Sequence, residues 1–447
     1  MHVPRNIDRR NGLSFSSGHR QTAPRTGEDS MLWQPALPPE YDRISDSEIA
    51  QRITERRSAL GKRLIILGHH YQQDDVIQHA DFTGDSFKLS QLAAEKVQEN
   101  GAEFVVFCGV HFMAESADIL TPPEVKVILP DLSAGCSMAD MANYEQTCRA
   151  WDTLQDSLQF EFESEDDQVG SSPDWHLIPI TYMNSSAAIK AFVGQHGGAV
   201  CTSSNADSVF KWALAGGGRK LRKGQRVKIL FLPDQHLGRN TAHNFGFVTE
   251  VDAKHSRKSA QTAVWDPMAD EGGLTIKQME EADVLLWKGH CSVHMLFRPE
   301  HVEQSRSEDP DVNVIVHPEC MQEVVDLADY SGSTEKILNT IRKSKPGTSW
   351  AVGTEVHLVN RVANELADRD ISVKTLSGCQ CLCTTMYRIS PQRLLWVLDG
   401  LAEGQARNVI SVHDDARKWA LVSLNRMLEL TAGGPADTPT KQSLAGV

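Results

Sequence analysis

The sequence predicts an α/β protein built from three similar units, each with a parallel sheet between layers of helices. Short β-branched runs alternate with helical patterns along most of the chain, which is typical of parallel strands joined by crossover helices. The alternation also repeats, because three strands run into the polar residues Tyr71, Asn184 and Glu319, and a second turn and a third strand follow each of them. We expect three-layer sandwich domains in a pseudo-threefold arrangement, with their strand ends at one shared central site.

The repeat also predicts how the chain is divided. The expected parts are a disordered extension (1–45), three α/β units (46–145, 146–300 and 301–387), a C-terminal helical segment (388–430) and a disordered tail (431–447). The middle unit is the longest, so we place insertions near 151–172 and 244–275. Both interrupt the strand and helix rhythm, and we therefore expect them to be surface excursions that add little to a core.

Cysteines stand near the end of each unit. They are Cys136, Cys291 and a group formed by Cys379, Cys381 and Cys383. Sites this far apart in the chain chelate a metal only if the fold brings them together. Three thiolates on an iron–sulfur cluster would leave one iron without a protein ligand, and that iron would be a Lewis acid.

Charge and hydropathy limit the classes of partner. The net charge of -14 and the pI near 5.6 argue against nucleic acid or an anionic membrane. No apolar run reaches the ~20 residues of a membrane helix, and the first 30 residues contain no apolar core of a secretion signal. We therefore expect a cytoplasmic protein that binds a small metabolite and whose cysteines are reduced or ligate a metal.

Seven motifs in order carry a resemblance to a known family. They are Gly-His-His-Tyr-Gln (68–72), Gly-Asp-Ser (84–86), Tyr-Met-Asn (182–184), Pro-Asp-Gln-His-Leu-Gly-Arg (233–239), Trp-Lys-Gly-His-Cys-Ser-Val-His (287–294), His-Pro-Glu (317–319) and Gly-Ser-Thr (332–334). Together they resemble the quinolinate synthase (quinolinate synthetase A) family over roughly residues 45–430. The order and number of the motifs make the resemblance specific.

The resemblance implies a condensing enzyme of NAD biosynthesis. Such an enzyme joins iminosuccinate (iminoaspartate) to dihydroxyacetone phosphate and forms quinolinate, phosphate and water, with the open iron of a 4Fe-4S cluster as Lewis acid. It leaves open a homodimer and a contact with L-aspartate oxidase, which makes the unstable imine. Two rival functions are a hydratase with the same kind of cluster and a nonenzymatic iron–sulfur sensor. The ordered motifs argue against the hydratase, and the acidic charge argues against the sensor.

The resemblance also implies the cluster ligands. Cys136 and Cys291 match the first two, and Cys381 is the choice for the third because it stands five residues before Met386, as in a Cys-x-x-x-x-Met pattern. Cys383 is the alternative. From the residues alone, this cysteine group also allows a separate metal knuckle or a redox pair, although alternate-residue spacing leaves a short chelate loop.

The remaining site residues follow from the same motifs. The positions matching substrate-binding residues of the family are His69, Ser86, Tyr182, Met183, Asn184, Ser203, His317, Pro318, Glu319 and Thr334, and the catalytic candidates are Tyr71, Tyr182, His294, His317 and Glu319. His317 and Glu319 are two residues apart and suit a base and its partner, while His294 would sit over the open iron. An alternative role as simple helix N-caps stays open for Ser86, Ser203 and Thr334. We expect structural parts for His236 and Arg239.

Overall fold

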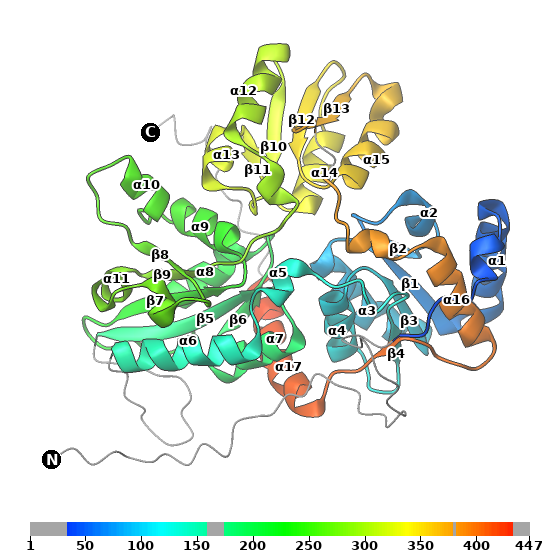
Figure 1. Cartoon of the computed structure of the whole chain (residues 1–447), viewed down its shortest axis with the longest axis horizontal. Helices are drawn as coiled ribbons and strands as arrows, with labels where there is room; N and C mark the ends of the chain where they lie inside the picture. The colour runs from blue at the N-terminus through cyan, green and yellow to red at the C-terminus, as the bar shows by residue number, and fades with distance from the viewer. Residues whose placement is uncertain (1–33, 159–173, 379–380, 432–447) are drawn as a thin grey trace.

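The molecule consists of three sheets with helices packed against them, and the three lie around its middle (Figure 1). The computed structural model describes residues 34–158, 174–378 and 381–431. Among these residues, every strand pair is parallel except β14 beside β4. The predicted class of an α/β protein with three parallel sheets is confirmed.

The strands of the three sheets are as follows. The first sheet contains β1 (Leu64–His69), β2 (Phe82–Gly84), β3 (Phe104–Cys108), β4 (Lys126–Ile128) and β14 (Val409–Ile410). The second contains β5 (Trp175–Tyr182), β6 (Ala199–Cys201), β7 (Arg226–Leu232), β8 (Thr262–Trp265) and β9 (Val284–Trp287). The third contains β10 (Asn313–Val316), β11 (Tyr330–Ser331), β12 (Ser349–Gly353) and β13 (Ser372–Thr375).

The helices follow the same division. With the first sheet lie α1 (Asp46–Leu60), α2 (Asp74–Ile77), α3 (Ser86–Asn100), α4 (His111–Leu120) and α5 (Ser137–Asp140). With the second lie α6 (Tyr144–Ser157), α7 (Ala187–Gln195), α8 (Ala206–Leu214), α9 (Gln235–Asn244), α10 (Glu250–Lys254) and α11 (Ile276–Glu281). With the third lie α12 (Pro299–Glu308), α13 (Gln322–Leu327), α14 (Thr334–Arg342) and α15 (Val356–Leu366). None of the helices in the described residues is both long and apolar enough to cross a membrane.

The three sheets share one strand order. The first begins β2-β1-β3-β4, the third reads β11-β10-β12-β13, and the second begins β6-β5-β7-β9 with β8 added at its edge. In each, the first strand of the unit lies between the second and the third strands. A common order means that equivalent strands end at equivalent places, so each unit presents the same kind of ligand-binding edge.

The segment 244–275 differs from the expected surface excursion. It contains α10 and the strand β8, which pairs in parallel with β9, and Trp265 at the end of β8 is 3% exposed. Burial of this indole and pairing with β9 place the segment in the second sheet. The first part of the other insertion is also not an excursion, because α6 buries Trp151 and Leu154 in the core of the second unit. The acidic stretch that follows lies outside the described residues.

Residues 34–45 differ from the predicted disordered extension. Gln34 donates to Asp131 over 2.7 Å, and the buried Tyr41 donates its hydroxyl to Asp399 over 2.8 Å. These contacts, together with apolar packing of Leu37 and Tyr41, fix the segment against the first unit. The rest of the predicted extension (1–33) and nearly all of the predicted tail (432–447) lie outside the described residues.

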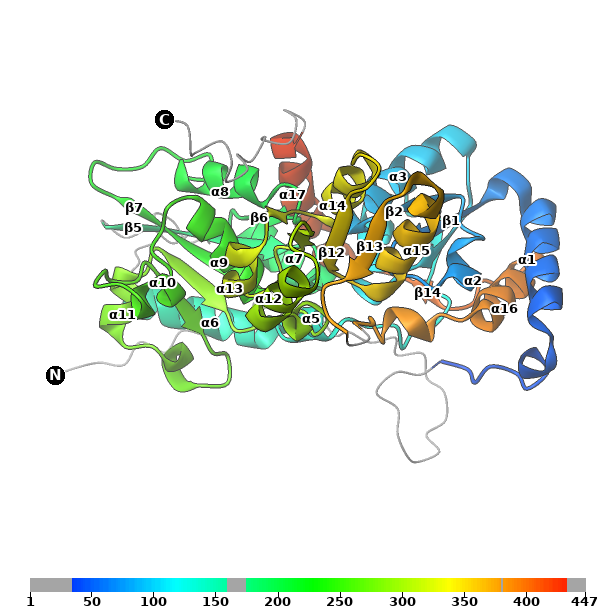
Figure 2. The same ribbon diagram turned by 90° about the horizontal axis from the view of Figure 1, so that it is seen from above.

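The C-terminal segment binds two units together. Its helix α16 (Pro391–Ala402) packs on α1, where buried Asp399 pairs with Arg52 and Arg56. Its strand β14 extends the first sheet, and α17 (Asp414–Thr431) packs on α7 and β6 of the second unit (Figure 2). Gly194 of α7 permits this close approach, since a Cβ there would lie 2.0 Å from the Trp419 carbonyl oxygen.

Candidate active site

All three units contribute to one central cavity. Its lining includes His69, Tyr71, Asp85, Ser86, Val110, Phe112, Met113, Cys136 and Met138 from the first unit, Tyr182, Met183, Asn184, Thr202, Ser203, Cys291 and Val293 from the second, and His317, Glu319, Thr334, Cys383, Thr385 and Met386 from the third and the chain that follows it. Most of the polar lining residues follow the carboxyl ends of strands. This is the location at which ligands collect in open α/β sheets.

Equivalent strands supply equivalent residues. The first strands of the units, β1, β5 and β10, lead to His69, Tyr182 and His317. The second strands, β2, β6 and β11, lead to a second set of hydroxyl-bearing residues, Ser86, Ser203 and Thr334. The repeat recognised in the sequence therefore brings one strand-end residue and one hydroxyl from each unit to the same cavity.

The hydroxyls of this second set are not the helix caps that the sequence allowed. The side chain of Asp85 caps α3 by accepting from Lys88 N, and the side chain of Ser333 caps α14 by accepting from Lys336 N. Ser86 and Thr334 are the first residues of these helices, and both line the cavity. Because neighbouring residues make the caps, capping does not account for these two hydroxyls.

The cysteines of the cavity are Cys136, Cys291 and Cys383. Each follows the strand in the fourth position of its sheet: β4, β9 and β13. Cys381, the predicted third ligand, is fully buried in the apolar core of the third unit and does not line the cavity. The geometry therefore favours the alternative, Cys383. Cys379 lies outside the described residues.

The three cavity cysteines share one local structure. The sulfur of Cys136 accepts hydrogen bonds from the backbone amides of Met138 and Ala139, and that of Cys291 from the amide of His294. The Cys383 sulfur likewise accepts from the amides of Thr385 and Met386. Amides of this kind stabilise negative charge on sulfur and tune the potentials of iron–sulfur clusters.

Burial opposes ionisation of these thiols. It raises the pKa of Cys136 to about 12 and raises the pKa of Cys291 well above its usual range. A cation bound between the three sulfurs would reverse this effect, since coordinated thiols are deprotonated. Sulfurs from three units, each supplied with N–H donors, fit a cluster held by three thiolates. Cys291 also belongs to a second group with His294 and Glu319, in which one ligand atom of each residue lies within 4.8 Å of the others.

Glu319 is the charged centre of the polar lining. Its Oε2 accepts from Nδ1 of His294 over 2.8 Å, and Tyr182 also donates to its carboxylate. Burial alone would raise the pKa of Glu319, but the hydrogen bonds from His294 and Tyr182 outweigh burial and hold the pKa well below its usual range. The 3% exposed side chain of Glu319 is therefore an ionised carboxylate at neutral pH.

A chain of hydroxyls continues from His294. The buried Thr354, directly after β12, has its Oγ1 3.2 Å from Nε2 of His294 and 2.9 Å from the hydroxyl of Tyr71. His294 therefore makes hydrogen bonds through both ring nitrogens, with Glu319 at Nδ1 and with Thr354 at Nε2. Thr354 thus connects Tyr71 of the first unit to the Glu319 carboxylate of the third.

His69 and His317 share a second arrangement. In each, Nδ1 accepts from the backbone amide two residues later, that of Tyr71 at 3.1 Å and that of Glu319 at 3.3 Å. Burial lowers the pKa of both imidazoles to about 3, so both are neutral and carry their proton on Nε2. They are neutral donors, a suitable type for binding carboxylate or phosphate oxygens in a buried site.

Comparison with known proteins now decides the family. Residues 51–429 match the family described as Quinolinate synthetase A protein. The chain belongs to this family. Curated relatives named quinolinate synthase include those of Acidobacterium capsulatum (48% identical, 87% of this chain and 95% of the relative), Halalkalibacterium halodurans (48%, 90% and 98%) and Rhodopirellula baltica (46%, 91% and 96%). This family member is therefore an enzyme of the quinolinate synthase type.

Most of the residues expected from the family motifs line the cavity. The exceptions are Cys381, Pro318 and His294. Pro318 contributes its backbone carbonyl to a contact with the second unit, and His294 lies behind Glu319 at 1% exposure. His317 and Glu319 lie in the turn after β10 and not within the strand.

Thr354 is not among the residues predicted from the sequence. Its only sequence signal is its position at the end of a predicted strand, Ser-Trp-Ala-Val-Gly-Thr, equivalent to the strand that precedes the Pro-Asp-Gln-His motif. Asp234 of that motif was also missed. Burial and the charge of Glu319 raise its pKa well above the usual range, and its side chain caps α9 by accepting from Leu237 N over 2.7 Å.

Proposed function

We propose that this enzyme condenses iminosuccinate with dihydroxyacetone phosphate to form quinolinate, phosphate and water. The observation that carries the proposal is the meeting of three cysteines, neutral donors and one ionised carboxylate in a single cavity between three units. This composition matches what the two substrates require, because they bring two carboxylates, one phosphate and a hydroxyketone. The product is a precursor of NAD, and a cytoplasmic location is consistent with the composition of the chain.

The anionic groups of the substrates would be bound by uncharged donors. His69 and His317 each present an Nε2–H, while Ser86 and Thr334 present hydroxyls at the first turns of α3 and α14. Helix N-termini favour anions because their first amides and the helix dipole both carry partial positive charge. Asn184 adds an oxygen, Oδ1, that is buried without a hydrogen-bond partner among the described residues, and it suits a substrate N–H or O–H donor.

Cys136, Cys291 and Cys383 would hold a 4Fe-4S cluster. When bound, such a cluster supplies a Lewis-acidic iron that polarises a substrate oxygen and assists the loss of hydroxide. The N–H bonds to the three sulfurs support this assignment, as does their shared position after the fourth-position strands.

Proton transfer would be carried out by Glu319 and Tyr182. The carboxylate of Glu319 is ionised, as a proton acceptor must be, and His294 fixes its orientation from behind. We assign it the proton removed when the triose phosphate enolises. Burial and the Glu319 charge raise the pKa of Tyr182 well above the usual range, so the phenol stays protonated and can return a proton. Enclosure by three units would keep water from the hydrolysable imine.

The deciding experiment measures product. Purified protein with its iron intact should form pyridine-2,3-dicarboxylate from dihydroxyacetone phosphate and freshly generated iminosuccinate under strict anoxia. The matched control is Glu319→Gln, which keeps the shape of the side chain but removes the negative charge. Absence of product with the iron-loaded protein would reject the proposed reaction. An equal rate with Glu319→Gln would reject the role of Glu319.

A further inference from the structure

One side chain of the second unit makes two hydrogen bonds to the turn that carries Glu319. Asn240 lies on α9 and is 4% exposed. Its Nδ2 donates to the carbonyl oxygen of Pro318 over 2.8 Å and to that of Cys320 over 2.9 Å. These two carbonyls belong to the residues immediately before and after Glu319. Both hydrogens of one amide group are thus directed at the backbone of the residue that carries the central charge.

The turn needs support because it lies outside the regular structure. Strand β10 ends at Val316 and α13 begins at Gln322, so residues 317–321 belong to neither. Within the turn, Glu319 N donates to Nδ1 of His317, and Cys320 N donates to the His317 carbonyl over 3.0 Å. Those bonds fix the turn to itself, and His317 N joins it to the third sheet by donating to the Gly353 carbonyl of β12 over 3.1 Å. The two bonds from Asn240 fix it to the second unit, which also supplies Tyr182.

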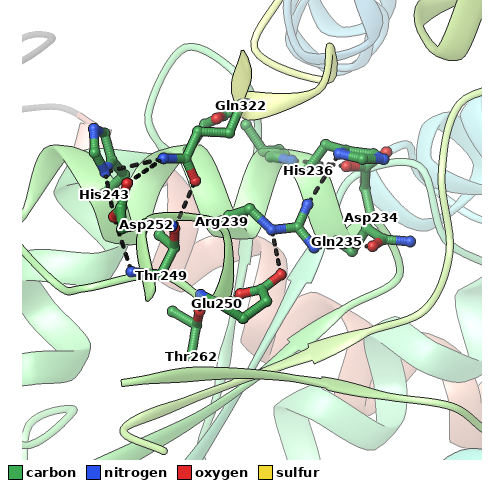
Figure 3. A network of polar contacts seen from close by, with 12 residues as sticks. Asp234, Gln235, His236, Arg239, His243, Thr249, Glu250, Asp252, Thr262 and Gln322 are labelled. Atoms are coloured by element: carbon green, nitrogen blue, oxygen red, sulfur yellow. Dashed lines mark hydrogen bonds and ion pairs between the residues drawn. The ribbon is translucent and has the colours of Figure 1, made fainter. Parts of the chain in front are cut away.

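The helix that presents Asn240 is itself rigidly placed. Arg239 donates to Glu250 over 2.5 Å, to Nδ1 of His236 over 3.0 Å and to Gln235 over 2.9 Å (Figure 3). At Gly238, a Cβ would lie 2.6 Å from the ring of Phe231, so α9 packs closely on its sheet. A donor on a rigid element holds its acceptors in place more accurately than a donor on a loop.

A second contact joins the same two units at a different place. Gln322 on α13 accepts from the hydroxyl of Thr249 over 2.7 Å and donates to Asp252 over 2.8 Å, with Nδ1 of His243 3.4 Å away (Figure 3). This contact holds α13 and not the carbonyls beside Glu319. It therefore allows the general strength of the interface to be separated from the placement of Glu319.

We propose that Asn240 is a positioning residue that holds the Glu319 carboxylate in place between His294 and Tyr182. The proposal rests on the proposed role of Glu319. Without the two bonds, the carbonyls of Pro318 and Cys320 lose buried donors, and the turn shifts to satisfy them elsewhere. Displacement of a reacting group by about 1 Å is enough to lower a rate on the order of 100-fold.

The first test is Asn240→Ala in the iron-loaded enzyme. We expect kcat to fall about 10- to 100-fold, while KM for dihydroxyacetone phosphate and the absorbance of the iron centre change less than about twofold. Two matched controls are Thr241→Val, which removes a hydroxyl on the same helix that donates to Leu237 O, and Gln322→Ala, which removes the second contact described above. Both should stay within about threefold of the wild-type kcat.

A double-mutant cycle separates positioning from a merely structural role. In the Glu319→Gln background, Asn240→Ala should lower kcat by less than about twofold, because the group that it positions is already disabled. A full multiplicative loss would overturn the proposal, and so would wild-type kcat in Asn240→Ala or an equal loss in Gln322→Ala. If Glu319→Gln alone keeps wild-type turnover, the proposed role of Glu319 fails first and the proposal for Asn240 fails with it.

Folding of the variant is checked by its Tm. Should Asn240→Ala not fold, Asn240→Ser keeps one donor and is expected to show an intermediate fall in kcat. Loss of folding in both variants, with normal folding of Gln322→Ala, would show that Asn240 serves stability and would overturn the positioning role.

Discussion

Thr354 offers a sensitive test of the chain of hydrogen bonds that joins Tyr71 to Glu319 through His294. Thr354→Val keeps the size of the side chain and removes the hydroxyl that lies 2.9 Å from Tyr71 Oη and 3.2 Å from His294 Nε2. Two hydrogen bonds are lost at a net cost of about 1 kcal/mol each, and the buried His294 Nε2 is left without its Thr354 partner at a further ~1 kcal/mol or more. We therefore expect the free energy of unfolding to fall by about 2–4 kcal/mol.

Activity should fall as well. Thr354 acts through His294, and loss of such an orienting partner costs on the order of 10- to 100-fold in activity at comparable sites. Urea unfolding and anaerobic product formation measure the two effects. Thr354→Ser is the matched control, since it keeps the hydroxyl and should retain most of both quantities. A Thr354→Val enzyme within 0.5 kcal/mol of wild-type stability, which is about half the net worth of one hydrogen bond, and with unchanged kcat would refute the assignment of this chain.

Three further predictions follow from the site. Replacing any of the three cavity cysteines (Cys136, Cys291 and Cys383) by Ser should remove iron and visible absorbance, whereas Cys381→Ser and Cys108→Ser should keep both; the reverse result for Cys381 and Cys383 would restore the ligand expected from the sequence. Glu319→Gln and Tyr182→Phe should keep the iron centre and lower kcat on the order of 100-fold or more, measured with saturating substrates, and unchanged turnover in either would contradict its role. Burial, together with the charge of Arg239, lowers the pKa of His236 to about 3. Below pH 6.5, His236 therefore binds a proton in the unfolded chain but stays neutral in the folded chain. The contribution of neutral His236 to the free energy of unfolding is fully present above pH 6.5 and is lost progressively as the pH falls toward 3. His236→Gln should remove about 2 kcal/mol of the loss in unfolding free energy between pH 7 and pH 5, and identical pH profiles for wild type and variant would reject a buried neutral His236.

The class of fold and most of the cavity lining could be predicted from the sequence. Buried parallel strands are continuous apolar runs, so their number and spacing can be read directly, and the polar residues that follow them must gather at the carboxyl edge of a sheet. His69, Tyr182 and His317 end or follow the first strands of their units, and all three line the cavity.

Details that depend on packing or on distant partners became visible in the three-dimensional arrangement. Cys381 and Cys383 are two residues apart, so the local sequence does not tell which of the two side chains points toward the cavity. In the structure, Cys381 packs in the apolar core of the third unit and Cys383 lines the cavity. The segment 244–275 reads as polar, yet it pairs β8 with β9 and buries Trp265. The roles proposed for Asn240 and Thr354 depend on hydrogen bonds to residues more than 50 positions away, at the boundaries between units. Periodicity in the sequence indicates which face of a helix or strand is buried. Hydrogen-bond partners in different units depend instead on how the three sheets pack together, and no local sequence pattern encodes that packing.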